Sequence, residues 1–108
     1  LMTSELLGLG LLDKADVQNE TPEKPAYKKY FMHGTAHHLG LNTHDYGLLH
    51  LHVEPNMVFT VEPGIYIPEE GFGVRLEDDV VIQKTGAPLN LMENIPIEIE
   101  EIESLMNA

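Results

Sequence analysis

Two strand-like runs joined by a short loop dominate the second half of the chain. Residues 57–62 are rich in branched and aromatic side chains, and the run resumes at residues 65–67 after a break at Pro63-Gly64. Residues 68–73 make a connection of the hairpin type, and residues 74–83 form the second run. This pattern predicts strands that pair in antiparallel fashion.

Helical patterns flank these strands. Thr3 and Ser4 precede a leucine-rich run, which predicts a helix ending near Leu12 although Gly8 and Gly10 weaken it. Pro96 is placed like a proline of a first helical turn. After it, apolar residues recur at helical spacing and predict a C-terminal amphipathic helix; they are Ile99, Ile102, Leu105 and Met106.

The remaining segments are less regular. Residues 13–25 are polar and hold two prolines, which predicts a loop or an exposed helical turn. Residues 45–56 are expected to form a loop, and residues 89–92 a short edge strand. We expect a bulge or bend at Asp78-Asp79, inside the second run. The order of elements predicts an α+β fold with a mostly antiparallel sheet and flanking helices.

Charge and composition limit the possible partners. The net charge is −12, from 18 acidic and 6 basic residues. This balance argues against nucleic acid, which requires a basic surface, and against anionic membranes. No apolar run approaches the roughly 18 residues of a membrane span. The chain has no cysteine, which excludes disulfides and thiolate metal sites and fits a cytoplasmic location.

Residues 33–45 hold four histidines, together with Gly34 and Gly40, which let the backbone approach closely. A lone histidine is more often a surface or core residue than a ligand. Four in so short a segment favour a metal or acid–base site. Imidazole and carboxylate together suit zinc, manganese, iron or cobalt.

The strands could supply the carboxylates. Side chains alternate between the faces of a strand, so Glu62 shares a face with Thr60, and Glu77 shares one with Arg75. If the two runs pair, Glu62 and Glu77 can face the same space, with Arg75 beside them. Such carboxylates repel each other unless a cation lies between them. A solvated face is the alternative reading of both glutamates.

Three motifs, in this order, closely resemble the proline-specific branch of the pita-bread metallopeptidases, whose members are the Xaa-Pro aminopeptidases and the Xaa-Pro dipeptidases (prolidases). The motifs are His33-Gly34-x-x-His37-x-x-Gly40-Leu41-x-x-His44-Asp45, Thr60-Val61-Glu62-Pro63-Gly64-Ile65-Tyr66 and Gly73-Val74-Arg75-Leu76-Glu77-Asp78-Asp79. The resemblance runs from about Phe31 to the C-terminal helix. It implies that residues 1–108 are the second half of a pita-bread catalytic domain.

The resemblance also implies a ligand set. His37, Glu62 and Glu77 match metal ligands, and Glu62 also handles the proton of the attacking water. A complete site of this family holds two metal ions, and manganese is the usual cofactor of the aminopeptidase branch. The implied reaction is hydrolysis of the peptide bond between an N-terminal residue and a proline, so proline-containing peptides are the expected substrates.

Three further residues match positions that do not bind metal. His33 and His44 correspond to histidines that bind substrate and stabilise the tetrahedral intermediate. Arg75 corresponds to a residue suited to orient a ligand carboxylate. These three residues, together with Glu62, are the predicted catalytic set.

The family pattern is incomplete in this chain. Its other ligands are two aspartates from the preceding half of the domain, and no matching pattern lies upstream of His33. Asp13 and Asp16 are too close together to supply them. We therefore expect the isolated chain to be inactive or nearly so and to bind one metal ion weakly or none. We also expect it to need the missing N-terminal half as a partner, and to form homo-oligomers through its uncovered apolar sheet face.

Several alternatives stay open. Nothing in the sequence separates an aminopeptidase from a prolidase, and a non-catalytic peptide- or protein-binding module is a further possibility. The spacing of the histidine motif disfavours a methionine aminopeptidase. His38 is expected to be structural or substrate-facing, and His50 and His52 are expected to lie in a solvated loop.

Overall fold

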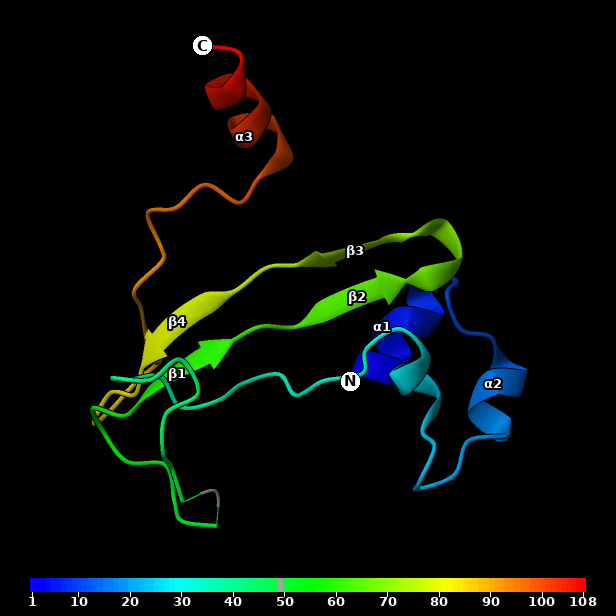
Figure 1. Cartoon of the computed structure of the whole chain (residues 1–108), viewed down its shortest axis with the longest axis horizontal. Coiled ribbons are helices and arrows are strands. Elements are labelled where there is room, and N and C mark those ends of the chain that lie inside the picture. The colour runs from blue at the N-terminus through cyan, green and yellow to red at the C-terminus, as the bar shows by residue number, and fades with distance from the viewer. Residues whose placement is uncertain (49) are drawn as a thin grey trace. The chain divides into compact units, whose positions relative to one another are not determined.

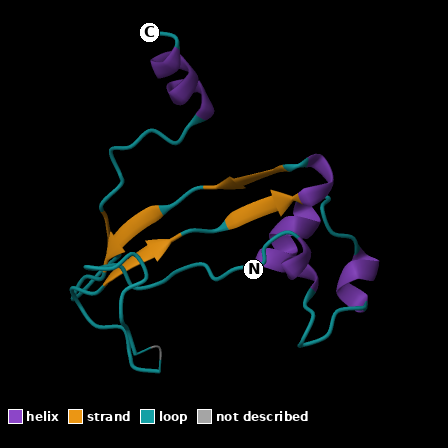
Figure 2. Ribbon diagram, viewed as in Figure 1, coloured by secondary structure: helices purple, strands orange, loops and turns teal. Residues whose placement is uncertain are grey.

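The computed structural model describes residues 1–48 and 50–108 (Figures 1 and 2). Leu49, in the predicted loop over residues 45–56, lies outside the described residues. The chain divides into two compact units. The first comprises Leu1–Gly34 with Gly64–Arg75, and the second comprises Thr35–Pro63 with Leu76–Ala108. Among the described residues, the helices are all too short or too polar to cross a membrane.

The first unit packs helices against a two-stranded antiparallel sheet. Its elements are α1 (Met2–Gly8), α2 (Lys14–Gln18), the 3₁₀ helix η1 (Ala26–Lys29), β2 (Gly64–Ile67), the 3₁₀ helix η2 (Pro68–Glu70) and β3 (Phe72–Arg75). Strands β2 and β3 pair with Gly64 opposite Arg75 and Ile67 opposite Phe72. Leu6, Leu12 and Tyr30 form the buried core of this unit. Ile65 and Ile67 pack against that core, which fixes β2 to the helices.

Helix α1 ends at Gly8, so the predicted end near Leu12 is wrong. Gly10 has a φ of +72°, a left-handed conformation that glycine adopts without strain. The chain turns there, and the backbone N–H groups of Leu11 and Leu12 both donate to the Leu6 carbonyl, at 3.0 and 3.2 Å. This turn returns Leu12 to the core.

Residues 13–25 were predicted to form a loop or an exposed helical turn, and helix α2 confirms the helical turn. Its first turn is closed by a capping box. The Asp16 N–H donates to Asp13 Oδ1 at 2.8 Å, and the Asp13 N–H donates to Asp16 Oδ2 at 2.9 Å. Both aspartates are therefore engaged in starting a helix.

The second unit is built on a three-stranded antiparallel sheet in the order β1-β4-β5. These strands are β1 (Val58–Val61), β4 (Asp78–Val81) and the short edge strand β5 (Leu89–Asn90). Figure 1 shows β1 and β4 side by side, and in their register Val58 faces Val81 and Val61 faces Asp78. The fold class predicted from the sequence, α+β with a mostly antiparallel sheet, is confirmed.

The second predicted run is divided into β3 and β4, with a break at Leu76-Glu77. The expected bulge at Asp78-Asp79 is wrong, because both residues lie in β4 in regular register with Val61 and Thr60. The break instead falls beside the interruption of the first run. Pro63 has no backbone N–H to donate to a strand hydrogen bond. Pairing therefore stops at Pro63 in the first run and at Leu76-Glu77 in the second.

Helix α3 (Ile99–Met106) confirms the predicted C-terminal helix. It starts later than expected, because Glu98 is its extended N-cap residue and Pro96 lies ahead of it. None of its residues is buried; Ile99 is 69% exposed and Met106 is 80% exposed. Its apolar stripe is therefore uncovered by the residues that the structure describes.

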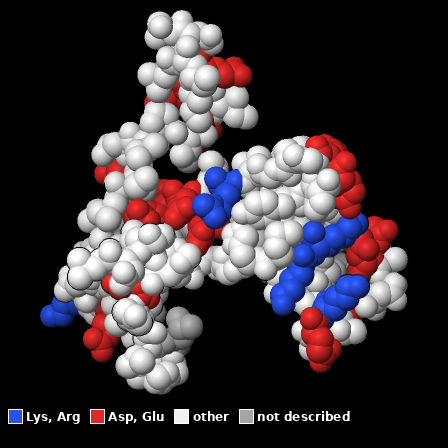
Figure 3. All heavy atoms as spheres, viewed as in Figure 1, with Lys and Arg blue, Asp and Glu red and all other residues white. Residues whose placement is uncertain are grey.

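Charged side chains are unevenly distributed over the face shown in Figure 3, where lysine and arginine side chains lie among acidic ones. A surface cavity of about 530 Å³ in the first unit is lined by both kinds. Its charged residues are Asp13, Asp16, Glu20, Lys24, Lys28 and Lys29. None of the predicted site residues lines it. Because acidic and basic side chains both line the cavity, its charge indicates no particular class of ligand.

Candidate active site

The histidine segment runs alongside β1 as an added, irregular strand. The Glu62 N–H donates to the Thr35 carbonyl at 2.8 Å, and the Thr60 N–H donates to the His37 carbonyl at 3.0 Å. His38 forms an antiparallel bridge with Phe59. Because side chains alternate along paired strands, this register presents His37, Thr60 and Glu62 on one face.

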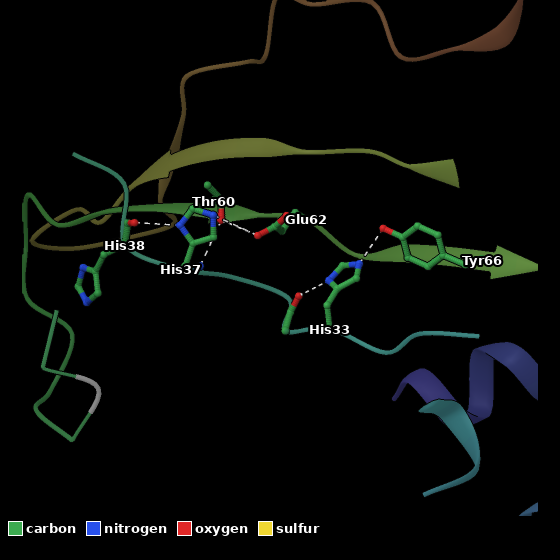
Figure 4. A network of polar contacts seen from close by, with 7 residues as sticks. His33, His37, His38, Thr60, Glu62 and Tyr66 are labelled. Atoms are coloured by element: carbon green, nitrogen blue, oxygen red, sulfur yellow. Dashed lines mark hydrogen bonds and ion pairs between the residues drawn. The ribbon is translucent and has the colours of Figure 1, made fainter. Parts of the chain in front are cut away.

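His37 and Glu62 point toward each other on that face (Figure 4). His37 Nε2 lies 3.2 Å from Glu62 Oε1, and the two side chains are 21% and 13% exposed. The other ring nitrogen of His37, Nδ1, donates to the His38 carbonyl at 2.9 Å. The backbone therefore fixes the orientation of the ring and directs Nε2 at the carboxylate.

This contact has a defined chemical requirement. In a neutral ring that carries its proton on Nδ1, Nε2 is an acceptor, and an ionised carboxylate has only acceptors. Two acceptors approach to this distance only when a second ring proton or a cation joins them. An imidazole nitrogen and a carboxylate oxygen are ligands that suit divalent transition metals, so this pair fits part of a metal site.

The pair does not by itself make a complete site. Among the described residues, no group of three or more histidine, aspartate or glutamate side chains is placed to hold a metal ion. Catalytic sites usually use three protein ligands. Glu77 is exposed and directly precedes β4. Continued by one residue, the register of β1 and β4 would place it opposite Glu62, and its role as a ligand stays a prediction.

His44 lies beside His37. The two ring centroids are 4.4 Å apart, with an edge-to-face angle of 62°. The turn that carries His44 is closed by Asp45, whose carboxylate accepts from the Leu41 N–H at 3.2 Å and from the Asn42 side-chain amide at 3.1 Å. The Asp45 N–H donates to the His38 carbonyl at 3.0 Å. These contacts of Asp45 therefore hold in place the turn that carries His44.

The turn should respond to acid through Asp45. The Asn42 side-chain amide, followed by the Tyr46 backbone N–H, lowers the pKa of Asp45 below its ordinary value of 3.8. A lowered pKa means that the charged form stabilises the turn above pH 3.8, and that this contribution is lost as the pH falls through the lowered pKa. We expect hydrogen exchange at the Asp45 amide to lose protection in that window. Asp45→Asn should show no such step, and an identical step in both proteins would contradict the assignment.

His33 is held by a separate set of contacts in the first unit. Its Nδ1 donates to the Gly34 carbonyl at 2.7 Å, and its Nε2 accepts from the Tyr66 hydroxyl at 2.8 Å (Figure 4). The ring packs edge-on against Phe31 and Tyr66, at centroid distances of 4.9 and 5.4 Å. The Tyr66 N–H donates to the Tyr30 carbonyl at 2.8 Å, which anchors this part of β2 to the core.

Tyr66 was not singled out from the sequence as a candidate site residue, although it ends one of the three motifs and its hydroxyl contacts His33. The signal available was its phenol group in an otherwise apolar strand, since a partly buried hydroxyl needs a partner. Thr60 was missed in the same way. Its side chain is 1% exposed, and its hydroxyl contacts both His37 and Glu62.

Tyr66→Phe tests the contact with His33. The variant keeps the ring packing but removes the hydroxyl that donates to Nε2, so we expect a loss of about 0.5–1.5 kcal/mol of folding stability. The His33 ring ¹⁵N resonances should shift as well. Tyr46→Phe is the matched control, because Tyr46 is 95% exposed. Equal urea midpoints and unchanged His33 resonances in the Tyr66 variant would show that the contact is absent in solution.

The other predicted residues fall in varied places. Arg75 ends β3 opposite Gly64 and is exposed, and its proposed orienting role stays a prediction. His38 packs on the Phe59 ring at a centroid distance of 4.3 Å, which fits the structural reading. His50 and His52 are exposed in the loop, as the sequence predicted.

Residues 10–84 match the sequence pattern of metallopeptidase family M24. The chain belongs to this family. The Xaa-Pro aminopeptidase of Escherichia coli is 45% identical over 120 aligned residues, which cover 100% of this chain and 26% of that protein. Human Xaa-Pro aminopeptidase 3 is 38% identical, and the match covers 96% of this chain and 23% of that protein.

Solved structures of the family support the fold. Aminopeptidase PepP of Pseudomonas aeruginosa superposes with a TM-score of 0.81 at 40% identity, over 97% of this chain and 26% of that one. The expected pita-bread architecture is thereby confirmed for this part of the fold. The chain spans about a quarter of the length of the curated relatives that it matches.

Proposed function

We propose that this chain carries the C-terminal part of the active site of a manganese-dependent Xaa-Pro aminopeptidase. The observation that supports this most strongly is the convergence of His37 Nε2 and Glu62 Oε1 at 3.2 Å, with the ring fixed by its Nδ1 contact. Family membership and the names of the relatives support the proposed reaction class, cleavage of the bond between an N-terminal residue and a proline.

Each residue has a defined part in this proposal. His37 and Glu62 hold a metal ion, and Glu77 joins them. When bound, a divalent ion polarises the scissile carbonyl and makes water nucleophilic at neutral pH. Glu62 takes the proton of the attacking water on its carboxylate. His44 and His33 contact the substrate, and Tyr66 orients His33 through the bond to Nε2.

The remaining ligands would come from outside this chain. We propose that two aspartates from the preceding part of a longer polypeptide complete the site, and that the 108 residues alone have little or no activity. Exposed apolar side chains such as Val74 (58%) and Leu105 (61%) support self-association of the isolated chain.

A chimaeric enzyme tests the proposal. In the Escherichia coli relative, the segment matched by this chain is replaced with all 108 residues, and cleavage of an Xaa-Pro tripeptide is measured with manganese. We expect hydrolysis of the Xaa-Pro substrate and none of a matched Xaa-Ala tripeptide. Preference for an Xaa-Pro dipeptide over the tripeptide would favour a prolidase.

The matched control is the same enzyme with the segment deleted. A chimaera that melts cooperatively but cleaves no faster than the deleted form would contradict the proposed function.

A further inference from the structure

The carbonyl oxygen of His38 accepts two hydrogen bonds from different parts of the histidine segment. One comes from His37 Nδ1 at 2.9 Å (Figure 4), and the other comes from the Asp45 backbone N–H at 3.0 Å. A backbone carbonyl has two lone pairs, so it can accept both bonds at once. The ring of a proposed metal ligand and the turn that follows it therefore end on the same atom.

The side chain of Asp45 closes this turn at its other end. The carboxylate accepts from the Leu41 N–H at 3.2 Å and from the Asn42 side-chain amide at 3.1 Å. A backbone bond inside the turn, from the Gly40 N–H to the Asn42 carbonyl, is long at 3.3 Å. The carboxylate makes the stronger closure, because hydrogen bonds to a charged acceptor are stronger than bonds between neutral groups.

Gly40 makes room for this carboxylate. A Cβ atom at residue 40 would overlap Asp45 Oδ2, whereas a Cβ atom at Gly34, in the same segment, would meet no atom within 4 Å. Neither glycine has a positive φ, so alanine is compatible with the backbone at both positions. Alanine at residue 40 therefore displaces the Asp45 carboxylate without changing Asp45 itself.

His44 lies between the two closures of the turn. It directly precedes Asp45, and the centroid of its ring lies 4.4 Å from that of the His37 ring, at an edge-to-face angle of 62°. The His44 side chain is exposed, so its own packing restrains it little. The placement of its ring therefore depends on the backbone of the turn, which Asp45 holds through both its N–H and its carboxylate.

We propose that Asp45 is a positioning residue that holds the His44 ring against His37. The proposal rests on the proposed function, in which His37 holds a metal ion and His44 contacts the substrate. Asp45 acts through His44 and touches neither the substrate nor the metal ion. A carboxylate that only stabilised the turn would change the free energy of unfolding but leave the His44 ring in place in the folded protein.

The first test uses the 108-residue chain without metal and follows the position of the ring. The nuclear Overhauser effect between the ring protons of His37 and those of His44 is compared in the wild type and in Asp45→Ala. This variant keeps the backbone N–H and removes the carboxylate. We expect the signal to fall at least about threefold, the size of effect that one hydrogen bond produces.

Gly40→Ala gives an independent test in which Asp45 is unchanged. It should lower the signal as much as Asp45→Ala, and the double variant should be no worse, because both changes remove the same contacts. Gly34→Ala is the matched control and should keep the signal. The Leu39 N–H donates to the Val58 carbonyl at 3.0 Å, and its protection from hydrogen exchange shows whether each variant keeps its fold.

An unchanged ring signal in a folded Asp45→Ala overturns the proposal, even if this variant unfolds at a lower temperature. If Asp45→Ala does not fold, Gly40→Ala decides in the same way. A loss in Gly34→Ala as large as the loss in Gly40→Ala would also overturn the proposal, because the loss would then not depend on the carboxylate.

The second test measures cleavage of the Xaa-Pro tripeptide by the chimaeric enzyme. Asp45→Ala should lower kcat/KM about three- to tenfold and leave the manganese concentration for half-maximal activity unchanged. In a His44→Ala background, the same change should lower kcat/KM by less than about twofold, because a residue that acts through His44 then has nothing to position. Equal fold losses in the two backgrounds would overturn the proposal.

The two tests separate this proposal from the proposed function. If the chimaeric enzyme is inactive while the ring signal depends on the Asp45 carboxylate, the positioning role of Asp45 stands and the proposed function fails.

Discussion

Glu62→Gln in the chimaeric enzyme is expected to lower cleavage of the Xaa-Pro tripeptide by at least about a hundredfold. Changes beside metal ligands already cost ten- to a hundredfold, and Glu62 is proposed to be both a ligand and the proton acceptor. Glutamine has the same shape but is a neutral ligand and a poor base. The measurement is the turnover rate at saturating manganese, with Glu69→Gln, in the exposed η2 turn, as the control.

His37→Ala should produce a loss of similar size, because the two side chains act as one unit across the 3.2 Å contact. Changes in residues that act together are not additive, so the double variant should be little worse than either single one. A Glu62→Gln enzyme that keeps more than a tenth of the activity would contradict the assignment of Glu62.

Leu6→Ala is expected to have the largest effect on stability. Leu6 is 0% exposed and packs with Leu12 and Tyr30 in the small core of the first unit. Removing a buried leucine side chain costs about 2–5 kcal/mol, because apolar contacts are lost and a cavity remains. Urea unfolding should therefore show a much lower midpoint. Loss of the core should also release Tyr66, which is anchored through Tyr30.

Leu9→Ala is the matched control, since Leu9 is 63% exposed in the same segment. It should change stability by no more than about 0.5 kcal/mol. Equal midpoints for the two variants would show that the buried cluster is not the core of this unit.

The sequence predicted antiparallel pairing because two runs rich in branched residues are joined by a short connection of the hairpin type. It could not locate the break at Leu76-Glu77. That break depends on Pro63 in the partner segment, which lacks a ladder donor, and pairing partners are not visible in a local pattern. The early end of α1 was also missed, because it depends on the turn that returns Leu12 to the core.

The resemblance to the metallopeptidase motifs implied that His37 and Glu62 belong to one site, and His37 Nε2 lies 3.2 Å from Glu62 Oε1. The hydroxyl contacts of Thr60 and Tyr66 were not predicted, because each joins residues more than twenty positions apart in the chain. Spacing rules describe faces of an element, whereas these contacts depend on how two segments pack.

Calorimetric titration of the 108-residue chain with Mn²⁺ tests the central claim most directly, because it counts the ions that these residues hold without a complete site. We predict at most one weakly bound ion per chain, with any binding heat lost in His37→Ala. Tight binding of two ions per chain, or binding that His37→Ala leaves unchanged, would contradict this account.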